Sequence, residues 1–204
     1  MGSEGASGKS SKAGAIVFKT VRTFRILDLD IENRPLTYLG EGFTTADITA
    51  IAWSWVGEED VTCFLVSPDT KSQRRMLSEF LKVYNQAGMV TGHYIRMHDL
   101  PIINGALLEH KLPLLGPKLT SDTKLDLVKR KDLSASQESL AGMYDLSQPK
   151  EHMSQTAWRK ANRLTVEGQE ETKRRCVGDV IQHKALRLRL IEAGALNPPT
   201  MWEP

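Results

Sequence analysis

The sequence has little cysteine and no long hydrophobic run. Among its 204 residues, Cys63 and Cys176 are the only cysteines, too few for a disulfide framework and without a zinc-ligand spacing. We expect both thiols to be reduced and partly buried. No segment approaches the roughly 18 to 20 apolar residues of a membrane span, and the first residues lack the apolar core of a signal peptide. These absences predict a cytoplasmic protein without a membrane partner.

Charge of one sign is not in marked excess either. The chain has 27 basic and 25 acidic residues, for a net charge of +2, so the global charge indicates no particular class of partner. Between Lys150 and Arg189, however, ten basic residues stand against five acidic ones. This local excess suits contact with phosphates, and it suits a solvated helical surface equally well.

The length and the composition predict one globular domain. The apolar fraction is 40% and the charged fraction is 25%, both ordinary for a protein that folds in water. Residues 1–19 are rich in Gly, Ser, Ala and Lys and predict a flexible arm. We place the folded domain at residues 20–195 and a Pro-rich tail at residues 196–204.

Hydrophobic periodicity predicts a mixed α/β fold. Three successive strands come first, followed by strands that alternate with helices, which favours a mixed sheet with helices on its faces. The expected strands are 24–32, 48–55, 61–66, 89–91 and 125–127, and the expected helices are 72–87, 100–110, 152–164 and 167–193. Another helix is predicted to begin near Ser134, because Ser134 and Gln137 have the spacing of a capping box. Gly194 and the segment Asn197–Pro199 predict the end of regular structure.

Two acidic residues stand near the end of the first expected strand. Asp30 and Glu32 lie two residues apart, so their side chains share one face of the strand, about 6.6 Å apart along the backbone. Hard divalent cations such as Mg²⁺ and Mn²⁺ take carboxylate oxygens as ligands. The pair is therefore a candidate metal site, although an acidic strand end is more often simply solvated.

Three motifs occur in the order typical of one nuclease superfamily. The segment Leu27–Glu32 ends a strand with Asp-x-Glu, and Gly92–Pro101 follows the pattern Gly-His-Asn-x-x-x-Phe-Asp-Leu-Pro with changes at two positions. Arg175–Val180 aligns with Tyr-Cys-x-x-Asp-Val. On these residues the chain resembles the DEDD superfamily of 3'-5' exonucleases, over most of its length. The resemblance implies a ribonuclease H-like fold, in which three antiparallel strands precede parallel ones and helices flank the sheet.

The resemblance also implies a function and its residues. It assigns Asp30, Glu32, Asp99 and Asp179 as catalytic ligands of two Mg²⁺ or Mn²⁺ ions. Two such ions neutralise a phosphodiester, activate a water molecule and stabilise the leaving oxygen. The implied partners are 3' ends of single-stranded DNA or RNA, together with replication or repair proteins. The candidate nucleic-acid contacts are Tyr94, His98, Lys150 and Arg175.

The third motif departs from the family at the position of the general base. The family has a Tyr four residues, or a His five residues, before the last Asp, and this chain has Arg175 and Arg174 there. Either the metal alone lowers the pKa of the water, or His93 or His98 serves as base, or catalysis is slow or absent. Arg175 also has the helical spacing for an ion pair with Asp179. A nucleic-acid-binding module without activity and an endonuclease of the same fold thus remain alternatives.

Overall fold

The computed structural model describes residues 24–34, 47–69, 71–129, 132–146 and 153–204. Within these ranges the strands are β1 (Ile26–Arg34), β2 (Asp47–Trp55), β3 (Thr62–Leu65), β4 (Met89–Gly92), β5 (Lys118–Asp122) and β6 (Thr200–Trp202). The helices are α1 (Ser72–Gln86), α2 (Asp99–Glu109), α3 (Thr123–Leu127), α4 (Gln137–Met143), α5 (Gln155–Asn162) and α6 (Val166–Glu192).

The strands form one mixed sheet in the order β3-β2-β1-β4-β5-β6. β1, β2 and β3 are antiparallel neighbours, whereas β1, β4 and β5 run parallel, and β6 returns antiparallel to β5. Three antiparallel strands followed by parallel ones, with helices on the faces, is the predicted architecture. The prediction of a ribonuclease H-like α/β fold is confirmed.

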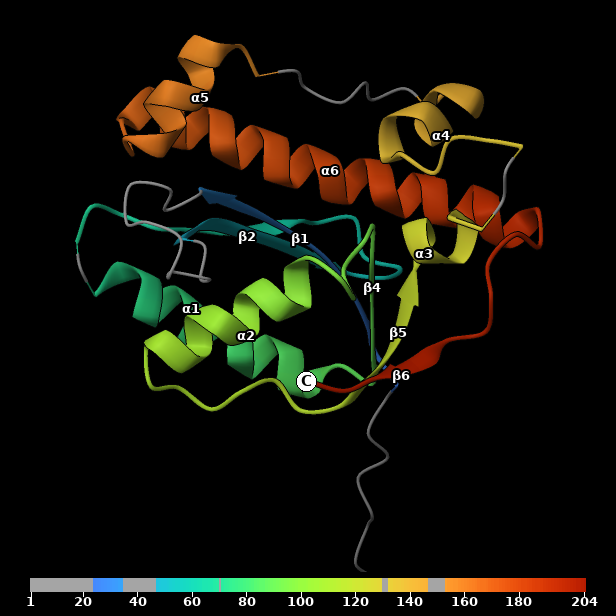
Figure 1. Ribbon diagram of the computed structural model, residues 1–204, viewed down its shortest axis with the longest axis horizontal. Helices are drawn as coiled ribbons and strands as arrows, with labels where there is room; N and C mark the ends of the chain where they lie inside the picture. The colour runs from blue at the N-terminus through green and yellow to red at the C-terminus, as the bar shows by residue number, and fades with distance from the viewer. Residues whose placement is uncertain (1–23, 35–46, 70, 130–131, 147–152) are drawn as a thin grey trace, which may run out of the picture.

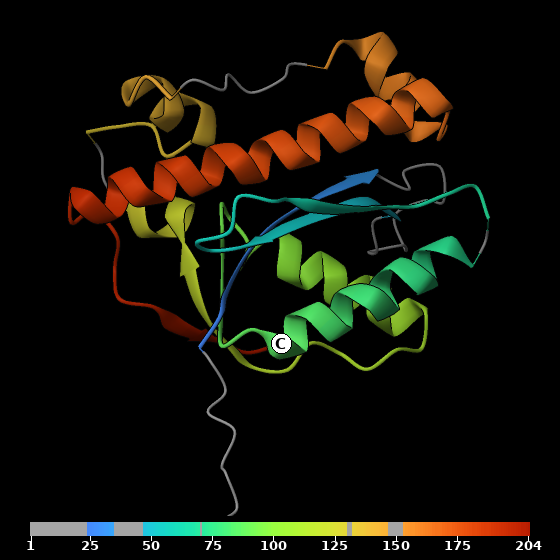
Figure 2. The same cartoon turned by 180° about the vertical axis from the view of Figure 1, so that it is seen from behind.

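Helices cover both faces of this sheet. The 27-residue helix α6 runs across one face, with α4 and α5 on its outer side, while α1 and α2 pack on the opposite face (Figure 1; Figure 2). α6 thereby passes above β1 and β2, a position that brings acidic residues of helix and strand together. In the described part of the chain, no helix combines the length and the apolarity needed to cross a membrane.

The two faces of the sheet are packed differently. The larger core fills the side of α1 and α2 and includes fully buried Leu27, Leu77 and Phe80, each of which stabilises the fold by about 1.5–3 kcal/mol on burial. On the side of α6, the residues of β2 are small. Ala50 and Ala52 of β2 are completely buried beneath the helix, and their short side chains let the helix approach the strands closely.

Three local predictions differ from the structure. Residues 125–127 are helical, because the carboxylate of Asp122 accepts hydrogen bonds from the N–H groups of Lys124 and Leu125 and so caps α3. The strand lies just before them. Helix α4 is capped by Ser136 and not by Ser134. Regular structure also resumes after Pro199, because β6 finds an open partner in β5. The proposed domain boundaries stay a prediction.

Candidate functional site

Three carboxylates from two elements converge above the C-terminal half of β1. Asp30 and Glu32 lie on β1 and Asp179 lies on α6, and each offers an oxygen within 4.8 Å of the others. Glu32 and Asp179 are buried and Asp30 is partly buried. Three negative charges held this close in a partly buried place repel one another unless a cation lies among them. The cluster can hold a metal ion, since its donors are the hard oxygens that divalent cations prefer.

A cation of the protein itself already contacts this cluster. Arg175 lies one helical turn before Asp179 on α6, and its Nε donates to Oε1 of Glu32 at 2.5 Å. A second guanidinium nitrogen lies 3.8 Å from Asp179 Oδ2. Burial alone lowers the pKa of Arg175, but the charges of Glu32 and Asp179 outweigh burial and raise that pKa. The predicted pairing of Arg175 with Asp179 exists, and the closer partner is Glu32.

Asp99 lies beside the cluster in the same pocket. It begins α2, is buried, and accepts a hydrogen bond at Oδ1 from the N–H of Ile31 at 3.1 Å. Its Oδ2 lies 3.5 Å from Nδ1 of His98. Burial raises the pKa of Asp99 against the opposing effect of His98, and the hydrogen bond to Asp99 raises the pKa of His98. The backbone contact fixes Asp99 to the centre of β1, between the two acids of that strand.

A cavity of about 360 Å³ opens above these acids. Besides the four carboxylates it is lined by basic and aromatic side chains. Lys124 Nζ lies 3.9 Å from the centroid of the Tyr94 ring, and the Arg175 guanidinium lies 5.2 Å from the ring of Trp158. Flat rings beside positive charges, next to an acidic cluster, suit a ligand that carries both bases and phosphates. The remaining lining residues are Ile31, Asn33, His93 and His98.

The loop after β4 presents Tyr94 to this cavity. Gly92 is required there, because a Cβ would lie 2.3 Å from Ile95 Cγ2 and 2.7 Å from the carbonyl oxygen of Leu29. Tyr94 itself has a φ of 74°, an unfavourable backbone conformation for a residue with a side chain. The buried carboxylate of Asp122 stabilises it by accepting hydrogen bonds from the N–H groups of Tyr94 and Arg96, both at 3.0 Å. The end of β5 therefore fixes the shape of the neighbouring loop.

A buried chain of hydrogen bonds runs behind the cavity. Nδ1 of His183 lies 2.8 Å from Oδ1 of Asp28, and its Nε2 lies 3.2 Å from Thr123 Oγ1, which lies 3.0 Å from Nδ1 of His93. An ionised carboxylate can only accept, so Nδ1 of His183 carries the proton that is donated to Asp28. The Thr123 hydroxyl lies within hydrogen-bond distance of Nε2 of His183, of Nδ1 of His93 and of the carbonyl oxygen of Gly92, so it links the two rings. The chain thus orients a ring that lines the cavity.

The structure brings most of the predicted residues to one place. Asp30, Glu32, Asp99, Asp179, Tyr94, His98 and Arg175 all line the cavity. Arg174 is exposed on α6 and does not line it. The predicted contact Lys150 falls outside the described residues.

Sequence reasoning missed Lys124, Trp158 and the pair Asp28–His183. A signal existed for the pair. Asp28 lies two residues before Asp30 on the strand, and His183 lies four residues after Asp179 on the helix. Since Asp30 meets Asp179, the residues one repeat further along the same faces of β1 and α6, Asp28 and His183, are expected to meet as well.

The structure is similar to that of the family B DNA polymerase from the hyperthermophilic archaeon Pyrobaculum calidifontis. The TM-score is 0.60 at 14% sequence identity, and the match covers 83% of this chain and 25% of the polymerase chain. Similarity at this level of identity establishes a shared fold. No family model matches the chain, and no curated protein matches it.

Proposed function

We propose that the protein is a metal-dependent 3'-5' exonuclease that removes nucleotides from 3' ends of DNA or RNA. The observation that carries the proposal is the convergence of Asp30, Glu32 and Asp179 in a cavity that also contains Asp99. Elements far apart in the chain supply these acids in the order of the three motifs. The likeness in fold to a DNA polymerase supports a substrate of the nucleic-acid class.

The four acids are the proposed ligands for two Mg²⁺ or Mn²⁺ ions. When bound, such ions supply charge neutralisation at the phosphate and a water molecule that is a nucleophile at neutral pH. Asp30, Glu32 and Asp179 lie close enough together to share an ion. Asp99 is held by the N–H of Ile31 at one carboxylate oxygen, which orients the carboxylate in the cavity. With cations bound to the carboxylates, Arg175, which contacts Glu32 in this structure, would be available to a substrate phosphate.

His93 is the proposed acceptor of the proton from water, in place of the Tyr or His that the third motif lacks. Its Nδ1 contacts the Thr123 hydroxyl. The hydrogen-bond chain from Asp28 through His183 and Thr123 therefore orients the His93 ring, and Nε2 is the nitrogen proposed to accept the proton. General base catalysis of this kind contributes about 10²–10⁴-fold to a rate.

The remaining cavity residues grip the end of the strand. Tyr94 and Trp158 offer ring faces to the terminal bases, and stacking of this kind contributes about 1–3 kcal/mol per base without sequence preference. Lys124 and Arg175 lie beside those rings and neutralise the adjoining phosphates. Lys150 remains a proposed contact. Replication or repair proteins are the proposed macromolecular partners.

The test is digestion of 5'-labelled single-stranded DNA and RNA in Mn²⁺. The wild-type protein is expected to give a ladder that shortens from the 3' end, and Asp30→Asn is expected to give none. Asp60→Asn, which changes an exposed carboxylate in the turn before β3, serves as the matched control and should cut normally. Internal cuts lost with Asp30→Asn would instead identify an endonuclease of the same fold.

The contact between Arg175 and Glu32 favours a second candidate, a nucleic-acid-binding module without activity. At 2.5 Å the guanidinium offsets part of the negative charge of the acids, and the cavity still offers Tyr94, Lys124 and Trp158 to a strand. In this case the protein binds the labelled strands without cutting them in either Mg²⁺ or Mn²⁺. Binding is then insensitive to Asp30→Asn and is lost with Tyr94→Ala.

A further inference from the structure

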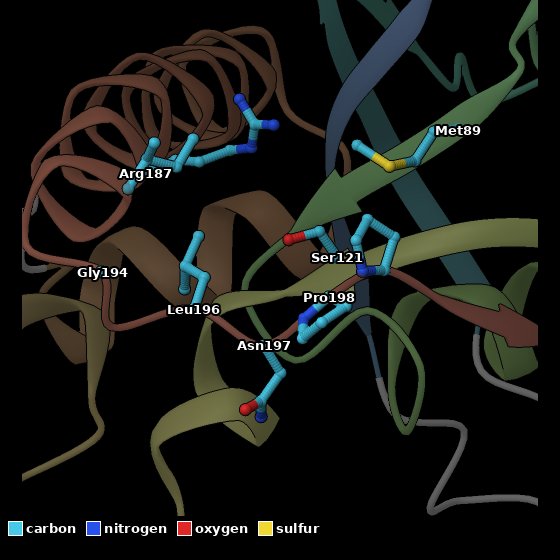
Figure 3. A pocket seen from close by; sticks show the side chains of 9 residues that line it. Met89, Ser121, Arg187, Gly194, Leu196, Asn197 and Pro198 are labelled. Atoms are coloured by element: carbon cyan, nitrogen blue, oxygen red, sulfur yellow. The ribbon is translucent and has the colours of Figure 1, made fainter.

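A second cavity lies further along α6, toward its C-terminal end, and shares no lining residue with the cavity of the acidic cluster. Its volume is about 370 Å³, and it lies between the C-terminal part of α6, the strands β4 and β5, and the segment that leads to β6 (Figure 3). This volume falls within the range of small-molecule sites. None of the four predicted catalytic acids lines it. Its lining residues are Met89, Ser121, Arg187, Ile191, Gly194, Leu196, Asn197, Pro198 and Pro199.

Among the residues that the structure describes, Arg187 is the only charged side chain that lines this cavity. The residue is 9% exposed, and in Figure 3 its side chain reaches from α6 toward the strands. Its Nε is enclosed and has no hydrogen-bond partner, and the ion pairs of the described residues do not include Arg187. An arginine keeps its positive charge under these conditions. The cavity is therefore lined by a guanidinium whose enclosed Nε–H group has no hydrogen-bond partner.

The surroundings of Arg187 compensate this charge only in part. Burial lowers the pKa of Arg187, and the negative charge of Asp28 opposes the effect. The Asp28 carboxylate, however, is already hydrogen-bonded to His183. A buried guanidinium N–H group without a hydrogen-bond partner disfavours the folded state. An anion that entered the cavity would relieve this unfavourable burial.

The other residues that line the cavity determine which kind of anion it favours. Met89, Ile191, Leu196 and the adjoining prolines make the cavity largely apolar, with the Ser121 hydroxyl as a polar group of the sheet that faces it (Figure 3). One guanidinium and one hydroxyl balance a single negative charge. A phosphate dianion would leave a second charge buried among apolar side chains, which is unfavourable. The planar fork of arginine also matches the two oxygens of a carboxylate.

We propose that this cavity is a binding site for a small monovalent carboxylate carried on a short apolar group. The carboxylate pairs with Arg187 and accepts from Ser121, while the apolar group lies against Met89, Ile191 and Leu196. The site is separate from the acidic cavity. Arg187 lies eight residues after Asp179 on α6, about 12 Å along the helix axis. Binding here is measurable without any nuclease assay, so it stands apart from the proposed function.

The test uses sodium hexanoate as the probe and hexanol as the uncharged control, with the full chain at constant ionic strength. At ten times its Kd, a ligand of the folded state raises the melting temperature of a chain this long by about 3 to 6 °C. Hexanoate is expected to do so and hexanol is not. Arg187→Met should weaken hexanoate binding by about thirtyfold or more. Arg189→Met removes the same charge from an exposed position on the same helix and should respond as the wild type does.

A second measurement does not depend on the folding of a variant. The ¹⁵N-labelled Nε–H group of Arg187, identified by its loss in Arg187→Lys, should shift in the NMR spectrum when hexanoate is added to the wild-type protein. The proposal is overturned if hexanoate produces neither this shift nor a change in melting temperature, or if its effect persists in Arg187→Met. An Arg187-dependent response to inorganic phosphate without one to hexanoate would also refute the assignment to carboxylates.

Discussion

Replacing Arg175 with Gln is expected to tighten the binding of a divalent cation to the acidic cluster. The guanidinium donates to Glu32 at 2.5 Å and lies 3.8 Å from Asp179. The side chains of Arg175, Glu32 and Asp179 are only 17%, 10% and 7% exposed, so water screens their charges weakly. A metal ion must take the same oxygens, and it must therefore displace the guanidinium or accept its repulsion. Glutamine keeps much of the length of the side chain and removes its charge.

The size of this effect follows from the contacts. Two unit charges about 4 Å apart interact by about 4 kcal/mol at an effective dielectric constant near 20. The net contribution of a hydrogen bond to a charged group is smaller, about 1.5–3 kcal/mol, because water competes for both partners. Since the guanidinium can swing aside and keep part of its interactions, we expect a gain near the lower end. About 2 kcal/mol corresponds to a roughly thirtyfold lower Kd for the ion.

The assay is calorimetric titration of the metal-free protein with MnCl₂. Arg174→Gln is the matched control, because it removes the same charge from the neighbouring exposed position of α6 and should change the Kd little. An unchanged or weaker affinity in Arg175→Gln would refute the reasoning. An equal gain in both variants would show that only the net charge matters. Arg175→Gln should also melt at a lower temperature than the wild type without metal, and Mn²⁺ should restore its stability.

Three further predictions concern the hydrogen-bond chain and the packing. Thr123→Val breaks the link to His93 and should lower kcat about a hundredfold with KM unchanged; equal falls in binding and turnover would contradict this. Gly168→Ala should lower the free energy of unfolding, measured in urea, by about 1–3 kcal/mol, because its Cβ would lie 2.3 Å from the backbone of α5. A Cβ at Gly178 would contact nothing, so Gly178→Ala should stabilise the fold by about 1 kcal/mol. Burial raises the pKa of Tyr84. The stabilisation of the folded state by the neutral Tyr84 ring is therefore complete below about pH 10 and is lost as the pH rises toward the pKa of the folded protein. Tyr84→Phe should lack this loss of stability, and parallel profiles of stability against pH for the two proteins would refute the prediction.

The sequence by itself determined the order and the type of most elements. Apolar residues alternate in residues 24–32 and recur with a helical period in residues 167–193. Each pattern arises because the element packs against a single neighbouring layer, so the strand and the helix can be predicted from the local sequence. The same periodicities put Asp30 with Glu32 on one face of β1. The three motifs then predicted which distant acid, Asp179, would join them.

Only the tertiary structure decided which side chains are partners. Arg175 contacts Glu32 across 143 residues, and the local helical pattern indicated only its pairing with Asp179. The same holds for α3, which is helical because Asp122 caps it, and for β6, which forms because β5 has an open edge. Arg187 looks in the sequence like one more basic residue of a helix. Its charge became informative because folding placed it in an apolar cavity, where the free energy of a charge depends on what surrounds it in space.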